Sequence, residues 1–129
     1  LMNIALLLRK LKPKEEAIEM LEFCIDMVNS NDKIYPKLCH NLSGIYSITK
    51  QYDKALKFSN LGIEHCLNKR EYSGLHILYY GKGIAECNLK HEEYIDSLNK
   101  AISFCETLGQ DEFKKVIINK CNKFYNIKL

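Results

Sequence analysis

Residues 42–56 read LSGIYSITKQYDKAL and decide the fold class of this chain. Leu42, Ile45 and Tyr46 follow three- and four-residue steps, which place apolar side chains on one face of a helix. A polar break at Lys50-Gln51 is followed at once by a second pattern of the same kind. Two amphipathic helices joined by so short a turn pack against each other as a hairpin.

The same helical spacing continues in both directions from this stretch. Leu1 is already inside an apolar helical pattern, so we expect the chain to be cut from a longer protein. Gly109 suits the position just after a helix, and Asp111 is expected to cap the last helix. No segment alternates with period two, so no strand is expected. The expected helices cover the chain start to Leu11, Pro13 to the break at Ser30, Pro36 to the break at Lys50, Tyr52 to about Asn68, about 71–89, about 91–108, and Asp111 onward.

Three of these helices share one sequence frame. Residues 15–21, 53–59 and 92–98 align, and the small residues Cys24, Gly62 and Ala101 follow in that frame at intervals of 38 and 39. A small side chain is needed where a helix lets its neighbour approach closely. Two helices per repeat with a period just under 40 predict an α-solenoid. Its repeats would cover 1–30, 34–68 and 71–108, with a C-terminal capping helix over 111–126.

Composition excludes several classes of protein. The chain has 129 residues, 47% of them hydrophobic and 27% charged, and a net charge of +3, which indicates one ordered globular domain with no charge excess for nucleic acid or a membrane. No apolar run approaches the ~20 residues of a membrane span. Six cysteines without a C-x-x-C motif, five of them on or beside apolar stripes, predict buried free thiols and a cytoplasmic protein without metal or cofactor.

The repeat resembles a known helical module. Residues 42–46, then 52–56 and Gly62, are similar to the tetratricopeptide pattern L-G-x-x-Y, Y-x-x-A and A. Ser43 and Gly62 replace the usual Gly and Ala by other small residues, whereas Tyr94 stands where Ala is usual in the third repeat. The resemblance implies an all-α, right-handed α-solenoid of about three tetratricopeptide-like hairpins plus a C-terminal capping helix.

A narrower resemblance rests on the type of repeat. Periods of 38 and 39, with LGIEHC at residues 61–66 and YYGKGIA at residues 79–85, are similar to the C-terminal sensor domain of peptide-pheromone-responsive regulators of Gram-positive bacteria, the Rap, NprR, PlcR, PrgX and Rgg group. That resemblance implies a short signalling peptide on the concave face of a quorum-sensing transcriptional regulator. It also implies an upstream output module, through which alone DNA would be contacted.

Polar residues on the first helix of each pair are the candidate ligand contacts, because those helices form the concave side of such a solenoid. Asn3, Asn41, Gly81 and Asn119 follow one another at intervals of 38, 40 and 38. An inward asparagine can donate to and accept from the backbone of an extended peptide. The spacing is equally compatible with chance in a sequence rich in asparagine.

Other groove candidates lie beside these positions. Lys37 and His40 share one side of the third helix with Asn41, and a lysine there suits a peptide carboxylate. Tyr46 and Tyr79 are expected to pack between repeats, which leaves Tyr80 as the exposed aromatic contact. The predicted peptide-binding set is therefore Asn3, Lys37, His40, Asn41, Tyr80 and Asn119.

No catalytic motif was found. Gly81-Lys82-Gly83 lacks the spacing and the preceding strand of a phosphate loop. We therefore expect a peptide- or protein-binding module that is not an enzyme, most simply the sensor domain of a peptide-regulated transcriptional regulator. The alternative is a general interaction scaffold or homodimer, for which Phe23, Phe58 and Phe104 lie off the core stripes and would supply exposed apolar surface. An enzyme-associated role would belong to an upstream bundle.

Overall fold

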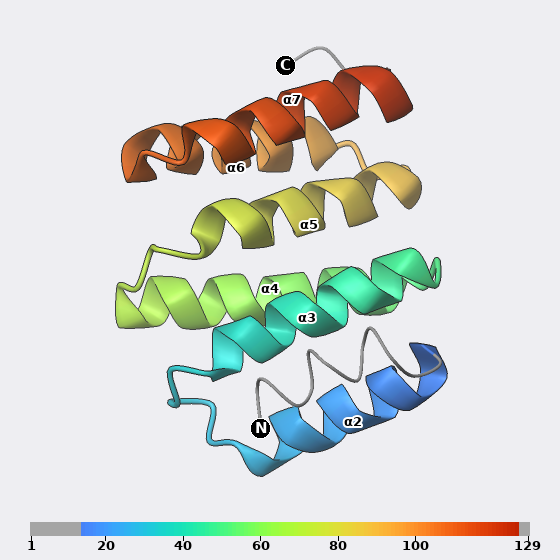
Figure 1. Ribbon diagram of the computed structural model, residues 1–129, viewed down its shortest axis with the longest axis vertical. Coiled ribbons are helices and arrows are strands. Elements are labelled where there is room, and N and C mark those ends of the chain that lie inside the picture. Colours follow the sequence, from blue (N-terminus) through green and yellow to red (C-terminus); the bar gives the residue numbers. More distant parts are fainter. Residues whose placement is uncertain (1–13, 127–129) are drawn as a thin grey trace.

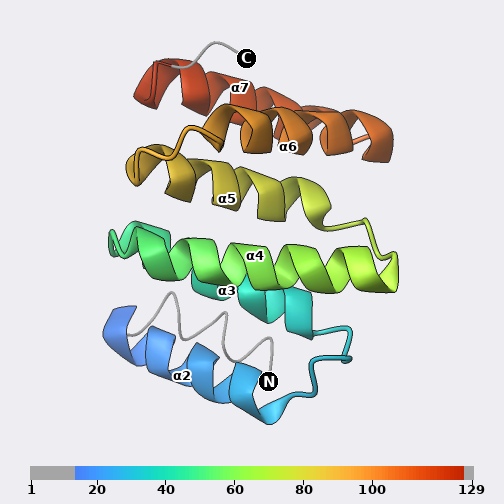
Figure 2. The same cartoon turned by 180° about the vertical axis from the view of Figure 1, so that it is seen from behind.

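The computed structural model describes residues 14–126, which form an all-α protein. The helices stack in chain order, with α3 and α7 in front of α4 and α6 in Figure 1 and behind them in Figure 2. This stack agrees with the expected helical-repeat solenoid, whose handedness stays a prediction. Among the described residues, no helix is both long and apolar enough to cross a membrane. The helices are α2 (Lys14–Met27), α3 (Tyr35–Ile48), α4 (Tyr52–Lys69), α5 (Leu75–Asn88), α6 (Tyr94–Leu108) and α7 (Asp111–Phe124).

One turn geometry recurs where α3, α4, α5 and α6 end. Lys50 and Lys90 both have φ of 62°, Arg70 has 55° and Gly109 has 70°, so each occupies the left-handed region. The residue after each donates its backbone N–H to the carbonyl five positions earlier, at 2.8 or 2.9 Å. This bond satisfies a carbonyl that the helix end leaves unpaired. Gly109 was predicted for such a position, whereas the two lysines and Arg70 were not.

Two helices begin later than their sequence pattern predicts. α5 starts at Leu75 instead of about residue 71, and α6 starts at Tyr94 instead of about residue 91. The N–H groups of Glu71 and His91 bond to carbonyls of the preceding helix, so these two residues still belong to its C-terminal turn. Apolar periodicity in the sequence carries no information about these backbone hydrogen bonds, so it predicts both helix starts too early.

The start of α7 also differs from expectation. Gln110 occupies the position before the helix, Asp111 is the first helical residue, and no side chain makes a capping hydrogen bond there. The N–H of Gln110 bonds to the carbonyl of Cys105, so α7 begins directly after the turn that ends α6. Asp111 therefore does not cap the helix, although its charge still suits the positive end of the helix dipole. The expected helix before Leu11, and Pro13, lie outside the described residues.

The hydrophobic core runs through the stack as two clusters. The first joins α2, α3 and α4 with Ala85 of α5, and the second joins the end of α4 to α5, α6 and α7. Each cluster spans more than one hairpin, so neighbouring repeats bury each other's apolar faces, as a solenoid requires. Completely buried members include Leu21, Leu38 and Leu42 in the first cluster, and Leu75, Leu98 and Ile117 in the second.

Small residues allow close contacts between helices, as the repeat frame predicts for Gly62. A Cβ atom at Gly62 would lie 2.8 Å from Cδ2 of Leu78 and 3.1 Å from Cβ of Cys39. A Cβ atom at Gly83 would lie 2.7 Å from the side chain of Leu98. A contact under 3.0 Å forces the neighbouring side chain to move, so glycine at both positions allows α3, α4, α5 and α6 to pack as they do without such a shift.

The predicted exposure of phenylalanines off the core stripes is correct for one of three. Phe23 is 58% exposed. Phe58 is buried and stacks on Tyr46 at 5.9 Å between ring centroids, and Phe104 is partly buried and stacks on Tyr79 at 5.6 Å. Both tyrosines are buried as predicted. Their rings cover the two phenylalanines, which helical spacing alone places off the apolar stripes.

The cysteines are buried free thiols, as their place on the apolar stripes predicts. All six are unpaired, five are buried and Cys87 is half-buried. Burial raises the pKa of the Cys39 thiol to about 12, so this thiol stays protonated at neutral pH. These cysteines act as small apolar core residues.

Candidate functional site

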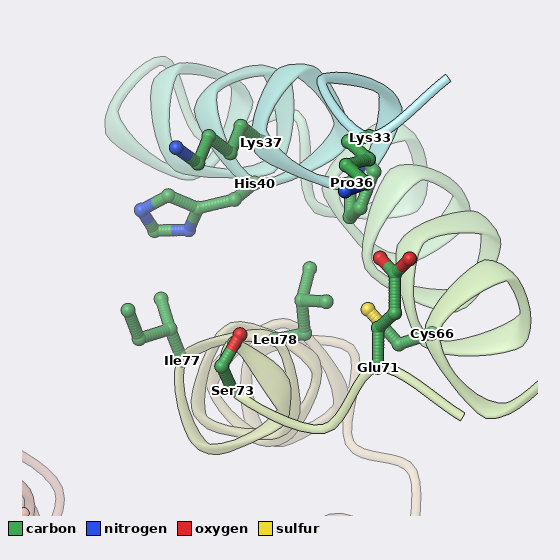
Figure 3. A pocket seen from close by; sticks show the side chains of 10 residues that line it. Lys33, Pro36, Lys37, His40, Cys66, Glu71, Ser73, Ile77 and Leu78 are labelled. Atoms are coloured by element: carbon green, nitrogen blue, oxygen red, sulfur yellow. The ribbon is translucent and has the colours of Figure 1, made fainter. Parts of the chain in front are cut away.

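Helices α3 and α5 enclose an open cavity of about 270 Å³ near their N-terminal ends. Figure 3 shows Lys37 and His40 projecting from α3 and Ile77 and Leu78 facing them from α5, with Cys66 of α4 at one side. The α3 wall is therefore basic and polar, whereas the α5 wall is apolar. A ligand in this cavity would contact two consecutive repeats at once.

A second cavity of about 490 Å³ continues from the first toward the C-terminal ends of the same helices. His40, Ile77 and Leu78 line both cavities, so the two form one depression, which we call the inner groove. Phe113 and Lys120 of α7, and Tyr125 directly after that helix, also line the second cavity. The inner groove is thus walled by α3, α5 and α7, the first helices of successive pairs and the capping helix.

The length of the inner groove follows from helix geometry. Its α3 wall runs from Pro36 to Ile48, which at 1.5 Å per residue is about 18 Å. An extended chain advances about 3.3 Å per residue, so the groove accommodates about five residues of an extended peptide.

Aromatic contacts hold α7 in place as the third wall. The ring of Phe113 meets His76 edge-on at 5.1 Å and Tyr80 edge-on at 5.9 Å, both on α5. Ile117 and Cys121, one and two turns further along α7, are completely buried. Because α7 docks through these apolar residues, Lys120 and the following Tyr125 are placed in the lining of the inner groove.

The charge of the inner groove is predominantly positive. Lys33, Lys37 and Lys120 line it, together with His40, and Glu71 is the one carboxylate among the lining residues. None of the three lysines makes an ion pair with a carboxylate within the described part of the chain. Their charge is therefore available to an acidic ligand.

Hydroxyl groups add hydrogen-bonding capacity to the second cavity. Burial, with smaller effects from Cys121 and Tyr125, raises the pKa of Tyr80 to about 12, so its phenol is protonated at neutral pH and can donate a hydrogen bond. At the floor, the hydroxyls of Ser43 and Ser59 bond to each other at 2.6 Å. Gly81 packs over this pair, since a Cβ atom there would lie 3.2 and 3.3 Å from the two oxygens.

Three residues of the predicted peptide-binding set line the inner groove. Lys37 and His40 lie in the first cavity, His40 extends into the second, and Tyr80 lies in the second. Sequence reasoning placed them on the side of α3 and α5 that faces away from the core. The structure brings the three together, although whether they bind a ligand stays a prediction.

The asparagines do not line the groove. Asn41 is 3% exposed and Asn119 is exposed on α7, and neither belongs to the lining of either cavity. Each is one residue away from a lining residue, His40 or Lys120, and one residue is a rotation of about 100° around a helix. Asn3 lies outside the described residues.

Sequence reasoning missed the apolar and aromatic lining of the groove. It includes Ile77 and Ile84 of α5, Tyr52 of α4, Phe113 of α7, and Tyr125 directly after α7. Their helical spacing does not separate them from core residues. The available signal was the width of the apolar face of α5, which carries more apolar residues than one stripe can bury.

The described residues hold no group of three or more His, Cys, Asp and Glu side chains that could bind a metal ion. The groove instead combines apolar walls, three lysines and a phenol, a set suited to noncovalent binding of a peptide segment.

Comparison with known proteins gave one finding. The model of the RNPP family C-terminal domain matches residues 1–126, nearly the whole chain. No protein of curated function and no solved structure matches this chain.

Proposed function

Because this chain belongs to the RNPP family of peptide-pheromone-responsive regulators, as its C-terminal domain, we propose that the inner groove binds a short signalling peptide. The observation that carries the proposal is the continuity of the two cavities across α3, α5 and α7. The groove has room for about five extended residues, and its apolar walls and polar groups are those that peptide recognition needs.

Binding there would couple to the arrangement of the repeats. A peptide in the groove contacts α3 and α5 together, and in the second cavity also Phe113 of α7. A ligand that contacts several helices favours the one arrangement in which all these contacts form. In our proposal this shift is passed to an output module outside these residues, in the cytoplasm, and DNA is contacted only through that module.

The proposal is tested with a synthetic library of pentapeptides, randomised at all five positions. The chain is incubated with the library, separated from free peptide by gel filtration, and the retained peptides are identified by mass spectrometry. Ile77→Arg places a long cationic side chain in the shared part of the groove and should abolish retention. Val116→Arg is the matched control, because Val116 is 42% exposed on α7 and lies outside the groove lining.

Two outcomes would contradict peptide binding in the groove. One is that the unmodified chain retains no peptide above a carrier protein. The other is that Ile77→Arg retains the same peptides as the unmodified chain. Circular dichroism of both variants establishes that they are folded.

A second function is favoured by a different surface. Met20, Phe23 and Met27 follow steps of three and four along α2 and are 36%, 58% and 66% exposed. An exposed apolar stripe of this kind is typical of a protein interface. It supports the alternative of an interaction scaffold or homodimer.

Sedimentation velocity over a hundredfold range of concentration tests this alternative. A homodimer predicts a sedimentation coefficient that rises with concentration and a loss of that rise in Phe23→Glu. A monomer at every concentration would contradict self-association through α2.

A further inference from the structure

The two walls of the first cavity differ in chemistry. Lys37 is an exposed residue of α3 and Lys33 lies just before that helix, whereas the facing residues of α5 are Ile77 and Leu78. In Figure 3 the basic and the apolar side chains lie on opposite sides of the open space. A ligand that fills this space therefore meets positive charge on one side and aliphatic surface on the other.

An extended peptide matches such a pair of walls in a specific way. Successive side chains of an extended chain point in opposite directions. If one residue faces α3, its neighbour faces α5. The residue facing Lys37 should then be acidic, and the next residue should be aliphatic or aromatic.

The lysines that line the first cavity outnumber its one carboxylate. Lys33 and Lys37 make no ion pair with the described carboxylates. Glu71 lies on the segment between α4 and α5, beside Cys66 at one side of the cavity, with its carboxylate directed toward Lys33 and Pro36 and away from Lys37 in Figure 3. At the other end of the groove Lys120 adds a further positive charge. Three lysines against one glutamate favour an acidic ligand over a neutral one.

Building on the proposed function, we propose that the inner groove selects acidic peptides, with an Asp or Glu side chain held at Lys37 and an adjacent apolar side chain against Ile77 and Leu78. The carboxylate comes from a side chain of the peptide in this proposal, because Lys37 lies within the α3 wall and the apolar wall opposite requires a neighbouring side chain. The groove would thereby select peptides in which an acidic residue and an apolar residue are adjacent, in either order.

The test uses two pentapeptide libraries that differ only in charge. Both carry an acetylated N-terminus and an amidated C-terminus, so neither has terminal charges. One library holds an equal mixture of Asp and Glu at one position and random residues elsewhere, and the other holds Asn and Gln at that position. Scanning the position from one to five, with retention read by mass spectrometry, gives the preference for the charged residue over its isostere.

We expect the acidic library to be retained about tenfold better at its preferred position in low salt, equivalent to about 1.4 kcal/mol. The preference should shrink in about 0.5 M NaCl, because salt screens charges in an open groove. It should disappear in the double variant Lys33→Gln, Lys37→Gln. Lys37→Arg should keep it, since the charge remains. Lys69→Gln is the matched control, an exposed lysine of α4 outside the inner groove.

The outcomes separate this inference from the function on which it rests. Retention of both libraries to the same extent would overturn acid selection and leave peptide binding intact. An acid preference that survives in the double lysine variant would also overturn it. Retention of neither library, nor of the same library with free termini, would overturn the proposed function. A third library with a free C-terminal carboxylate and no acidic residue reveals whether a chain terminus serves instead, which would also contradict the proposed source of the carboxylate.

Discussion

Gly83→Ala should destabilise the protein, although alanine favours helices more than glycine. Gly83 lies inside α5, where replacement by alanine normally gains about 1 kcal/mol. The new Cβ atom would lie 2.7 Å from both Cγ and Cδ2 of Leu98 and 3.3 Å from its backbone nitrogen. Leu98 is completely buried, so its side chain has little room to move away. Overpacking typically costs 1–3 kcal/mol, and the net effect should be a loss of about 1 kcal/mol.

The sign should reverse once Leu98 is shortened. Leu98→Ala removes the two side-chain atoms that Cβ of residue 83 would meet at 2.7 Å and leaves the backbone nitrogen at 3.3 Å. By itself it should cost about 2–5 kcal/mol, because it leaves a cavity. Adding Gly83→Ala to that variant should then stabilise it by up to about 1 kcal/mol, since the severe contacts are gone and the helix preference dominates. The two substitutions are therefore expected to couple by about 2 kcal/mol.

Urea denaturation followed by far-UV circular dichroism measures the four proteins of this cycle. Gly74→Ala is the control, because a Cβ atom at Gly74 would meet no atom within 4 Å, and it should change the free energy of unfolding equally with and without Leu98→Ala. If Leu98→Ala does not fold in buffer alone, the whole cycle is repeated in a fixed concentration of sucrose, which stabilises folded proteins. An equal effect of Gly83→Ala in both backgrounds would refute the reasoning that Leu98 requires glycine at this position.

Three further predictions concern single residues. Lys90→Gly should raise the free energy of unfolding by about 0.5–1 kcal/mol in urea denaturation, because Lys90 has φ of 62°, which glycine adopts without strain; a decrease would contradict this. Burial lowers the pKa of His76, so the unfolded chain binds more protons and the free energy of unfolding should fall as pH drops below about 6.5. The slope of that fall should be smaller in His76→Phe, and an unchanged slope would assign it to other groups. Iodoacetamide at neutral pH should label half-buried Cys87 before buried Cys39, as mass spectrometry of digested protein would show, with the difference lost in urea.

Sequence reasoning predicted the helices and part of the groove because both depend on angular position around a helix. Leu42, Ile45 and Tyr46 define the buried face of α3, and Lys37 and His40 then lie on the groove side. Two other residues of the predicted set, Asn41 and Asn119, lie one position away from the groove lining, and their binding role stays a prediction. Asn41 and Asn119 were assigned from repeat spacing, which has gaps of 38 and 40, and not from the core face of their own helices.

Apolar periodicity could not predict which residues form the walls of the inner groove. Ile77 lines the groove and Leu78, its neighbour, is buried and also lines it. Both are apolar, so no local sequence pattern distinguishes a residue that lines the groove from one that packs in the core. Only the position of α3 relative to α5 separates the two roles.

By itself, the sequence determined the all-α class, the pairing of helices into hairpins and the small residues at Gly62 and Ala101, because these depend on local periodicity and on contacts that recur in every repeat. The tertiary structure alone decided that Phe113 docks on His76 and Tyr80 and so makes α7 the third wall of the groove. It also decided where α5 and α6 begin, through backbone bonds to the preceding helix. The physical reason is that the angle between two helices is set by side chains distant in sequence that pack together, and no local pattern records which of them will meet.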